Sequence, residues 1–482
     1  MQRSSIWKSF QLWVTTLSAL WIASGEAIEV KDKGSSLTSS NANVSQEQTS
    51  PPMNPSTSTA TPPFMNDAFG MGPQELLGMG DKHYFGQGVP VDYAQAFHYY
   101  QMAVEKGSSE AKQRLGYLYE NGKGVAKDYL KAFDLYQQAA NEGIPAAMNN
   151  LGWFYYNGWA VTKDYAKAVN WFQKGADKGE PFSQTNLGWM YSFGHGVPQD
   201  YGVAVQLYKK AADQGNLQAQ TNLGWMHENG KGLPADLTEA VKWYRKAAEG
   251  GNANGQANLG FMYEQGKGVP KDAQAAIHWY TKAADQDNAQ ALNNLGWMTQ
   301  TGEGVAVDVA KAAALYRKAA DQGFASSQVN LGWLYQNGQG VTKDLTQAAS
   351  WYQKAADQNF ALGQTNLGWL YLNGDGVATD YAKALELFTK SADHGETGAQ
   401  NNLGFMYETG KGVERNLDQA RTWYEKAATA GNQYGLYNMG RIYTYGLGVP
   451  IDAAKGTEYY QKAARAENTD AQTELKKQNL SW

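Results

Sequence analysis

Residues 217–251 read LQAQTNLGWMHENGKGLPADLTEAVKWYRKAAEGG, and the spacing of their apolar and small side chains decides the fold. Ala219, Leu223 and Met226 are four and then three residues apart, and His227 continues the same stripe. This spacing predicts one face of an amphipathic helix.

The rest of the stretch predicts a turn and a second helix. Two glycines and a proline within residues 230–236 do not continue a helix. Asp236 can cap the next helix by accepting a hydrogen bond from its first-turn amides. Small and aromatic residues then recur with helical spacing over residues 240–248, and a glycine pair ends the helix. The stretch is therefore expected to be a helical hairpin.

The hairpin pattern recurs eleven times at a constant period, without insertion or deletion. Its phase is marked by a Leu-Gly pair at Leu115-Gly116, Leu151-Gly152, Leu187-Gly188, Leu223-Gly224, Leu259-Gly260, Leu295-Gly296, Leu331-Gly332, Leu367-Gly368 and Leu403-Gly404, with Met79-Gly80 and Met439-Gly440 as outer variants. Successive pairs are 36 residues apart, as Leu115 and Leu151 show. A strict period of this length is typical of a solenoid, in which each unit buries its apolar face against its neighbours.

Small residues occupy fixed columns of the repeat. A glycine inside a helix costs about 0.8 to 1 kcal/mol relative to alanine, so its recurrence implies a packing reason. We expect Gly224 and its equivalents to lie where a side chain would hold two helix backbones apart. We expect the pair Ala247-Ala248 to let the next unit approach closely.

These columns resemble the Sel1-like repeat (SLR), a relative of the tetratricopeptide repeat (TPR), over about 400 residues. The residues that carry the resemblance are Ala219, Leu223-Gly224, Gly230, Gly232, Asp236, Ala240, Trp243-Tyr244, Ala247-Ala248 and Gly251. The resemblance implies an all-α, right-handed α-solenoid of about eleven helix-turn-helix repeats with a C-terminal capping helix. Four local departures are Ala160 at the second loop glycine, Asn416 at the capping Asp, and Asp287 and Asn359 at the terminal glycine.

The chain divides into four expected segments. Residues 73–467 form the solenoid, and residues 468–482 form the capping helix and tail. Residues 28–72 are rich in Ser, Thr, Asn and Pro and are expected to be a disordered linker. Residues 1–27 carry positive charge, a short apolar run and then small residues, which predicts an export signal cleaved near residues 25–27.

This leader predicts an exported protein, periplasmic or secreted, that does not span the membrane after signal removal. A bacterium is the expected source, and a eukaryotic lumenal protein is the alternative. The net charge of -5 argues against a basic nucleic-acid surface, so no nucleic-acid partner is expected. The sequence contains no cysteine, which excludes disulfides and a zinc-thiolate site. We expect no cofactor and no metal.

Two further columns predict a partner surface on the first helices, which typically line the concave wall of such a solenoid. The aromatic column, two residues after the Leu, points away from the core stripe; it contains Trp153, Trp189, Trp225, Phe261, Trp297, Trp333, Trp369 and Phe405. The amide column, one residue before the Leu, contains Asn150, Asn186, Asn222, Asn258, Asn294, Asn330, Asn366 and Asn402. Asparagine can pair with a peptide bond or a sugar hydroxyl, and tryptophan supplies rigid contact area.

A structural alternative explains the same columns without a ligand. Successive first helices lie roughly 10 Å apart, so each ring can fold over its neighbour and seal the wall while Asn side chains bridge between helices. If a ligand does bind, a neutral or basic segment fits better than a free acidic terminus. Glu120, Glu228, Glu264 and Glu408 are nearby, and only the end repeats place arginine in these columns.

An enzyme is not expected. The six histidines fall in several different columns, which favours structural substitution over a shared ligand set. His227-Glu228 lacks the second histidine of a zinc-protease helix, and no Gly-x-Ser-x-Gly elbow occurs. The Gly-x-Gly of residues 266–268 lies between two expected helices, unlike a dinucleotide-binding loop.

Three functions follow from the sequence and the resemblance. The first is an exported, non-enzymatic scaffold that binds a protein or extended peptide through its concave face, in envelope signalling or assembly or in host-cell interaction. The second is carbohydrate or cell-wall glycan binding through the Trp and Asn columns. The third is a β-lactam-hydrolase-like activity, implied by cysteine-rich relatives whose disulfide framework is absent here.

Overall fold

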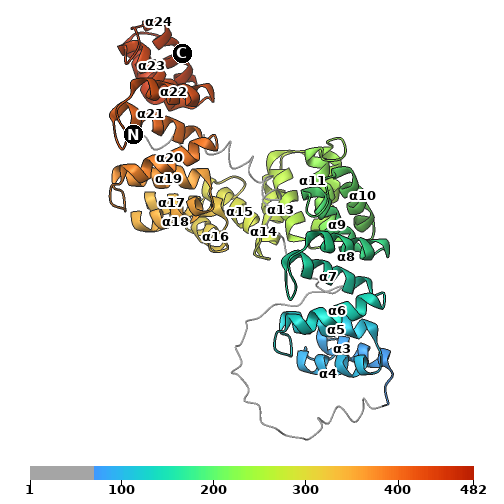
Figure 1. Cartoon of the computed structure of the whole chain (residues 1–482). Helices are drawn as coiled ribbons and strands as arrows, with labels where there is room; N and C mark the ends of the chain where they lie inside the picture. The colour runs from blue at the N-terminus through green and yellow to red at the C-terminus, as the bar shows by residue number, and fades with distance from the viewer. Residues whose placement is uncertain (1–69) are drawn as a thin grey trace. The chain divides into compact units, whose positions relative to one another are not determined.

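The computed structural model describes residues 70–482, and the regular elements of that part of the chain are all α-helices. The expected export signal and most of the expected linker, residues 1–69, lie outside the described residues. The helices pair as hairpins that follow one another along the chain (Figure 1). This confirms the predicted all-α repeat fold.

The described chain forms two compact units, which meet in sequence between Asp236 and Leu237. In the N-terminal unit, the first helices of the repeats are α3 (Pro73–Phe85), α5 (Ser109–Asn121), α7 (Pro145–Asn157), α9 (Pro181–Phe193) and α11 (Leu217–Asn229). The second helices of that unit are α4 (Tyr93–Glu105), α6 (Tyr129–Asn141), α8 (Tyr165–Asp177) and α10 (Tyr201–Asp213).

The C-terminal unit begins with a second helix. Its first helices are α13 (Ala253–Gln265), α15 (Ala289–Thr301), α17 (Ala325–Asn337), α19 (Ala361–Asn373), α21 (Thr397–Thr409) and α23 (Gln433–Tyr445). Its second helices are α12 (Leu237–Glu249), α14 (Ala273–Ala284), α16 (Val309–Asp321), α18 (Leu345–Asp357), α20 (Tyr381–Asp393), α22 (Leu417–Thr429) and α24 (Ala453–Arg465). The final helix, α25 (Thr469–Lys477), buries Ala471 and Leu475, as expected of a cap.

Local sequence sets the ends of each helix, as the repeat containing α17 and α18 shows. Helix α17 ends at Gly338, whose φ of 66° lies in the left-handed region and whose N–H donates to the Leu334 carbonyl. Helix α18 begins after Asp344, whose carboxylate accepts a 2.9 Å hydrogen bond from the Gln347 N–H. The predicted hairpin boundaries are therefore correct in this repeat.

The phase glycine has the packing role that the sequence predicts, because a side chain at this position would push apart the two helices of the repeat. A Cβ added at Gly332 would lie 2.7 Å from the Cε1 atom of Tyr352, on the second helix of the same repeat. The glycine therefore lets the two helices close on an aromatic ring. The ring of Tyr352 is fully buried, so it fills the space between its two helices.

Close approach between successive repeats occurs at the alanine pair, as predicted. A Cβ on Gly363 of α19 would lie 2.6 Å from the Ala355 Cβ of α18. The second loop glycine also contacts the preceding repeat, because a Cβ on Gly340 would lie 2.4 Å from the Val309 carbonyl oxygen. These contacts fix the spacing of the repeats.

The four sequence departures are accommodated without a change of fold. Ala160, Asp287 and Asn359 take the left-handed conformation of the glycines that they replace, with φ values of 59°, 59° and 58°. The Asn416 side chain caps α22 by accepting from the Gln419 N–H at 2.9 Å. At these four positions the substituted residue keeps the backbone conformation or the helix cap of the usual residue, so the hairpin is unchanged.

First helices of neighbouring repeats also contact one another directly. Helix α7 contacts α9 in the N-terminal unit, and α17 contacts α19 in the C-terminal unit. In each unit, first helices of neighbouring repeats thus lie side by side, and we call the surface that they form in a unit its first-helix wall. It is the surface on which the sequence places the aromatic and amide columns.

Candidate partner-binding surface

The aromatic column lies on the first-helix wall, but most of its rings are only half-exposed. Trp369 is 39% exposed and Phe261 is 7% exposed. The other members are half-buried: Trp153, Trp189, Trp225, Trp297, Trp333 and Phe405. The column is thus less open to solvent than the helical periodicity predicted.

The reason is contact between rings of successive repeats. The ring centroids of Trp153 and Trp189 are 6.3 Å apart, and Trp153 also meets Phe172 edge to face at 5.8 Å. Trp297 and Trp333 pack against the core cluster around Tyr316. An indole spans much of the gap between neighbouring first helices, so one part of each ring seals the wall and the remainder faces solvent.

The amide column links first helices to one another. Asn330 Nδ2 donates to Asn293 Oδ1 of the preceding repeat at 3.0 Å, and Asn186 does the same to Asn149 at 2.8 Å. Both donating residues are buried. At these two positions the Asn side chains bridge neighbouring helices, as the structural alternative expects.

Other members of the amide column have different surroundings. Asn150 accepts from Gln113 Nε2 at 3.3 Å, Asn222 accepts from Gln218 Nε2 at 2.9 Å, and Asn294 donates to the Tyr280 hydroxyl at 3.1 Å. The remaining members are half-buried: Asn258, Asn366 and Asn402. The column therefore combines bridging amides with amides that lie closer to the surface.

Carboxylates of the first helices hold the buried tyrosine hydroxyls, a role that sequence reasoning missed. The Tyr280 hydroxyl donates to Glu264 Oε2 at 2.6 Å, and Tyr424 donates to Glu408 at 2.8 Å. Burial raises the pKa of Glu264, an effect that the Tyr280 hydrogen bond opposes. A signal was available in the sequence, because each acceptor precedes its tyrosine by 16 residues.

The two arginines of these columns are paired with acids. Arg441 Nη2 lies 2.9 Å from Glu408 Oε1, and Arg114 Nε lies 3.3 Å from Asp81 Oδ1. Their charge is thus partly neutralised within the wall.

The middle residue of the Gly-x-Gly loop packs on aromatic rings, which sequence reasoning also missed. Lys123 Nζ lies 4.9 Å from the Tyr93 ring centroid and 5.1 Å from that of Tyr84. At the equivalent position, His195 stacks on Tyr165 with centroids 5.2 Å apart and planes 9° apart. Burial first, and the charge of Lys163 second, lower the pKa of His195.

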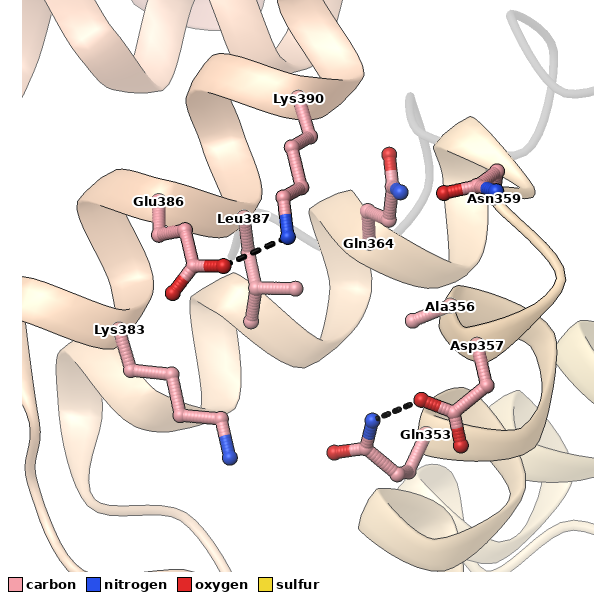
Figure 2. A pocket seen from close by; sticks show the side chains of 9 residues that line it. All are labelled: Gln353, Ala356, Asp357, Asn359, Gln364, Lys383, Glu386, Leu387 and Lys390. Carbon is pink, nitrogen blue, oxygen red and sulfur yellow. Dashed lines mark hydrogen bonds and ion pairs between the residues drawn. The ribbon is translucent and has the colours of Figure 1, made fainter.

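A groove lies between the second helices α18 and α20 of the C-terminal unit. We call it the second-helix groove; it encloses a cavity of about 320 Å³. Figure 2 shows its lining residues, which are Lys383, Glu386, Leu387 and Lys390 from α20, Gln353, Ala356 and Asp357 from α18, Asn359 from the turn after α18, and Gln364 from the first helix α19. No residue pattern in the sequence predicted this groove.

Within residues 70–482, no group of three or more His, Cys, Asp or Glu side chains is placed to hold a metal ion. In the same range, no helix has the length and apolar character needed to cross a membrane.

The sequence matches the family model described as Sel1 repeat eleven times. The matched residues are 74–108, 109–144, 145–180, 181–216, 217–252, 253–288, 289–324, 325–360, 361–396, 397–432 and 433–468. A search of curated proteins gave no match. The matches cover the region that the repeat period delimited.

Solved structures of similar proteins share the repeat. A protective antigen of uropathogenic Escherichia coli strains, c5321, displays an SLR fold; it is 35% identical, with 86% of this chain and 90% of that chain covered and a TM-score of 0.62. A Sel1 repeat protein of Oxalobacter formigenes is 33% identical, with 64% and 89% covered and a TM-score of 0.45.

Proposed function

Since the chain belongs to the Sel1 repeat family, we propose that it is an exported, non-enzymatic scaffold that binds a protein or peptide partner through its first-helix wall. Sel1 repeat proteins are generally non-catalytic scaffolds, and their repeat solenoid is typical of protein-protein interaction. The proposal concerns the surface used, the export and the chemistry of the partner.

The main support is the partly exposed aromatic and amide side chains that recur on the first helices of both units. Trp369 is the clearest case, because 39% of its surface is exposed and Asn366 precedes it by one helical turn. A peptide crossing the wall can lay an apolar side chain on the indole and pair its backbone with an amide. Affinity would then be distributed over several repeats.

The charge of the wall favours a neutral or basic partner. Glu120 and Glu408 lie among the first-helix residues and accept from tyrosine hydroxyls, while the nearby Arg441 is already paired with Glu408. A basic side chain of the partner can approach these carboxylates, whereas an acidic terminus lacks an unpaired arginine to bind.

Export is supported by the leader-like sequence at residues 1–27 and by the relative from uropathogenic E. coli, which is described as a protective antigen. A function in envelope assembly, envelope signalling or host contact is consistent with such a location.

Glycan binding is the second candidate. The observation that favours it is the exposed indole of Trp369, because flat aromatic rings can stack on the apolar face of a sugar. The half-buried state of most other rings leaves a shorter platform for a sugar chain than the sequence predicted.

A photo-crosslinking experiment tests these alternatives. A photoreactive phenylalanine analogue replaces Trp369 in one variant and Trp482 in the control, because the two tryptophans are 39% and 40% exposed. In envelope or host-cell extract, we expect a protein adduct at position 369 and none at position 482.

Glycan-array binding that Trp369→Ala abolishes, without any protein adduct, would favour the second candidate. Nitrocefin turnover by the purified protein would contradict the non-enzymatic assignment.

A further inference from the structure

The middle residue of the Gly-x-Gly loop can cover the aromatic-column ring of its own repeat with a positive charge. Lys267 follows Phe261 by six residues, and its Nζ atom lies 4.7 Å from the Phe261 ring centroid. Lys411 follows Phe405 by the same number of residues, and its Nζ atom lies 5.3 Å from that ring. In these two repeats the chain itself supplies the cation that packs on the ring.

The repeat of Trp369 lacks such a cation. The residue six positions after Trp369 is Asp375, which is shorter than lysine and carries the opposite charge. The loop backbone is the same, because Gly374 and Gly376 have φ values of 76° and 72° and the two glycines that flank Lys411 both have 73°. The Asp375 side chain therefore starts from the place that Lys411 has in the next repeat, but it brings no ammonium group to the indole.

The Trp369 ring is consequently open to a ligand. It is 39% exposed, whereas Phe261 beneath Lys267 is 7% exposed. Within residues 70–482, no cation and no second aromatic ring packs on the Trp369 ring. A cation from outside the chain can therefore reach this indole.

The Asp375 carboxylate is open as well. Glu303 is the acid at the same loop position two repeats earlier, and Lys271 Nζ lies 2.6 Å from its Oε1 atom. Lys343 is the counterpart of Lys271, but aspartate is one methylene group shorter than glutamate. Within the described residues, the Asp375 side chain makes no hydrogen bond or ion pair. It is half-buried, and its carboxylate oxygens reach the surface.

The start of the preceding second helix supplies a third, apolar side. A Cβ on the second glycine of the Asp375 loop would lie 2.7 Å from Leu345 Cβ, so this loop rests on Leu345 of α18. At the equivalent point of the next repeat, the Tyr381 ring centroid lies 5.6 Å from Lys411 Nζ. The methylene chain of a basic residue can lie along such a surface while its charge stays in water. We call the site formed by Trp369, Asp375 and Leu345 the cation slot.

We propose that the cation slot binds the side chain of a lysine or arginine supplied by a partner polypeptide. The positive group lies over the Trp369 indole, as Lys411 lies over Phe405, and donates a hydrogen bond to the Asp375 carboxylate. The slot favours a cation because tryptophan is the best aromatic partner for one and because the slot carries a negative charge. The inference rests on the proposed function, since Trp369 belongs to the first-helix wall, and adds the charge of the partner's side chain.

The test uses the full chain labelled with ¹⁵N-tryptophan and follows the indole N–H of Trp369 by NMR. That resonance is assigned by its loss in Trp369→Phe. The probe is acetyl-Ala-Arg-Ala-amide, and the control is the same peptide with citrulline, which has the shape of arginine without its charge. We expect a saturable shift with the Arg peptide and an affinity at least about fivefold lower for the citrulline peptide.

Equal affinities for the two peptides, or no shift with either, would overturn the inference. Either result is distinguishable from failure of the proposed function, because the photo-crosslink at position 369 reports a protein partner of any charge.

Variants of the loop show whether the open ring and the carboxylate are what the cation recognises. Asp375→Lys supplies the cation from the chain itself, as Lys411 does, and should abolish the shift with the Arg peptide. Asp375→Asn keeps the size of the side chain without its charge and should weaken binding. Gln87→Lys adds a lysine at the same loop position of the first repeat and should leave the affinity unchanged. Undiminished binding of the Arg peptide to Asp375→Lys would also overturn the inference.

Discussion

At Gly332, the space of one methyl group determines whether the two helices of a repeat can close on a tyrosine ring. The Tyr352 ring is fully buried beside this glycine. The sequence shows the glycine column plainly, but it does not show which atom fills the space. That atom belongs to the second helix, about 20 residues away. The helical periodicity of a sequence shows which face of a helix is buried, but not which atom of another helix contacts it.

Substitution of this glycine should destabilise the protein. In Gly332→Ala, the new methyl would lie 2.7 Å from Tyr352 Cε1, and we expect a loss of about 1 to 3 kcal/mol from overpacking. Gly78→Ala is the control, because that helical glycine has no atom within 4 Å of its added Cβ. Urea unfolding monitored by circular dichroism measures both. A Gly332→Ala variant as stable as Gly78→Ala would contradict the packing.

A single histidine should give the N-terminal unit a pH-dependent stability. Burial lowers the pKa of His195, and its Nδ1 atom has no hydrogen-bond partner in the described structure. The folded state therefore favours the neutral ring, so stability is full above the ordinary histidine pKa and falls as the pH drops through the lowered value. We expect this loss between pH 7.5 and pH 5.

The measurement compares melting temperatures of the wild type and His195→Phe at both pH values. Phenylalanine keeps a ring that can stack on Tyr165 but cannot be protonated, so the decline on acidification should be smaller in the variant. Identical declines in the two proteins would show that His195 is not the group responsible.

At the scale of the element, the hairpin boundaries follow from local residues, which is why the sequence predicts them well. Gly338 ends a helix by its left-handed conformation, and Asp344 begins one by its cap. The second-helix groove could not be predicted in this way. It is lined by residues of three helices, and its volume depends on how far apart α18 and α20 lie; leucine stands in the column of Leu387 also at Leu207 and Leu315, so the column gives no signal for it.

The turn after each second helix allows two opposite substitutions to be compared. Asp287 has a φ of 59° where Gly323, one repeat later, has 90°. Asp287→Gly should stabilise the protein by roughly 0.5 to 1 kcal/mol, and Gly323→Asp should destabilise it by about 1 to 2 kcal/mol, because left-handed backbone costs a residue with a Cβ. Thermal unfolding of both variants checks the pair, and changes of the same sign would contradict the account.

At the scale of the whole molecule, the repeat period alone predicts the eleven units that the family matches and the helices confirm. It does not predict how far each indole reaches across the gap to the next repeat. That distance is set by contacts such as Gly363 against Ala355, which tie one repeat to its neighbour. The aromatic column therefore has the predicted residues but is more buried than predicted.

The most direct test of the central claim is the affinity of the crosslinked partner, once purified, for three forms of the chain. We predict that the double variant Trp369→Ala and Asn366→Ala binds at least about tenfold more weakly than the wild type, a loss of about 1.4 kcal/mol. Trp482→Ala should bind like the wild type, and all three should melt at similar temperatures. Unchanged affinity in the double variant, together with a lowered melting temperature, would show that the column only seals the wall.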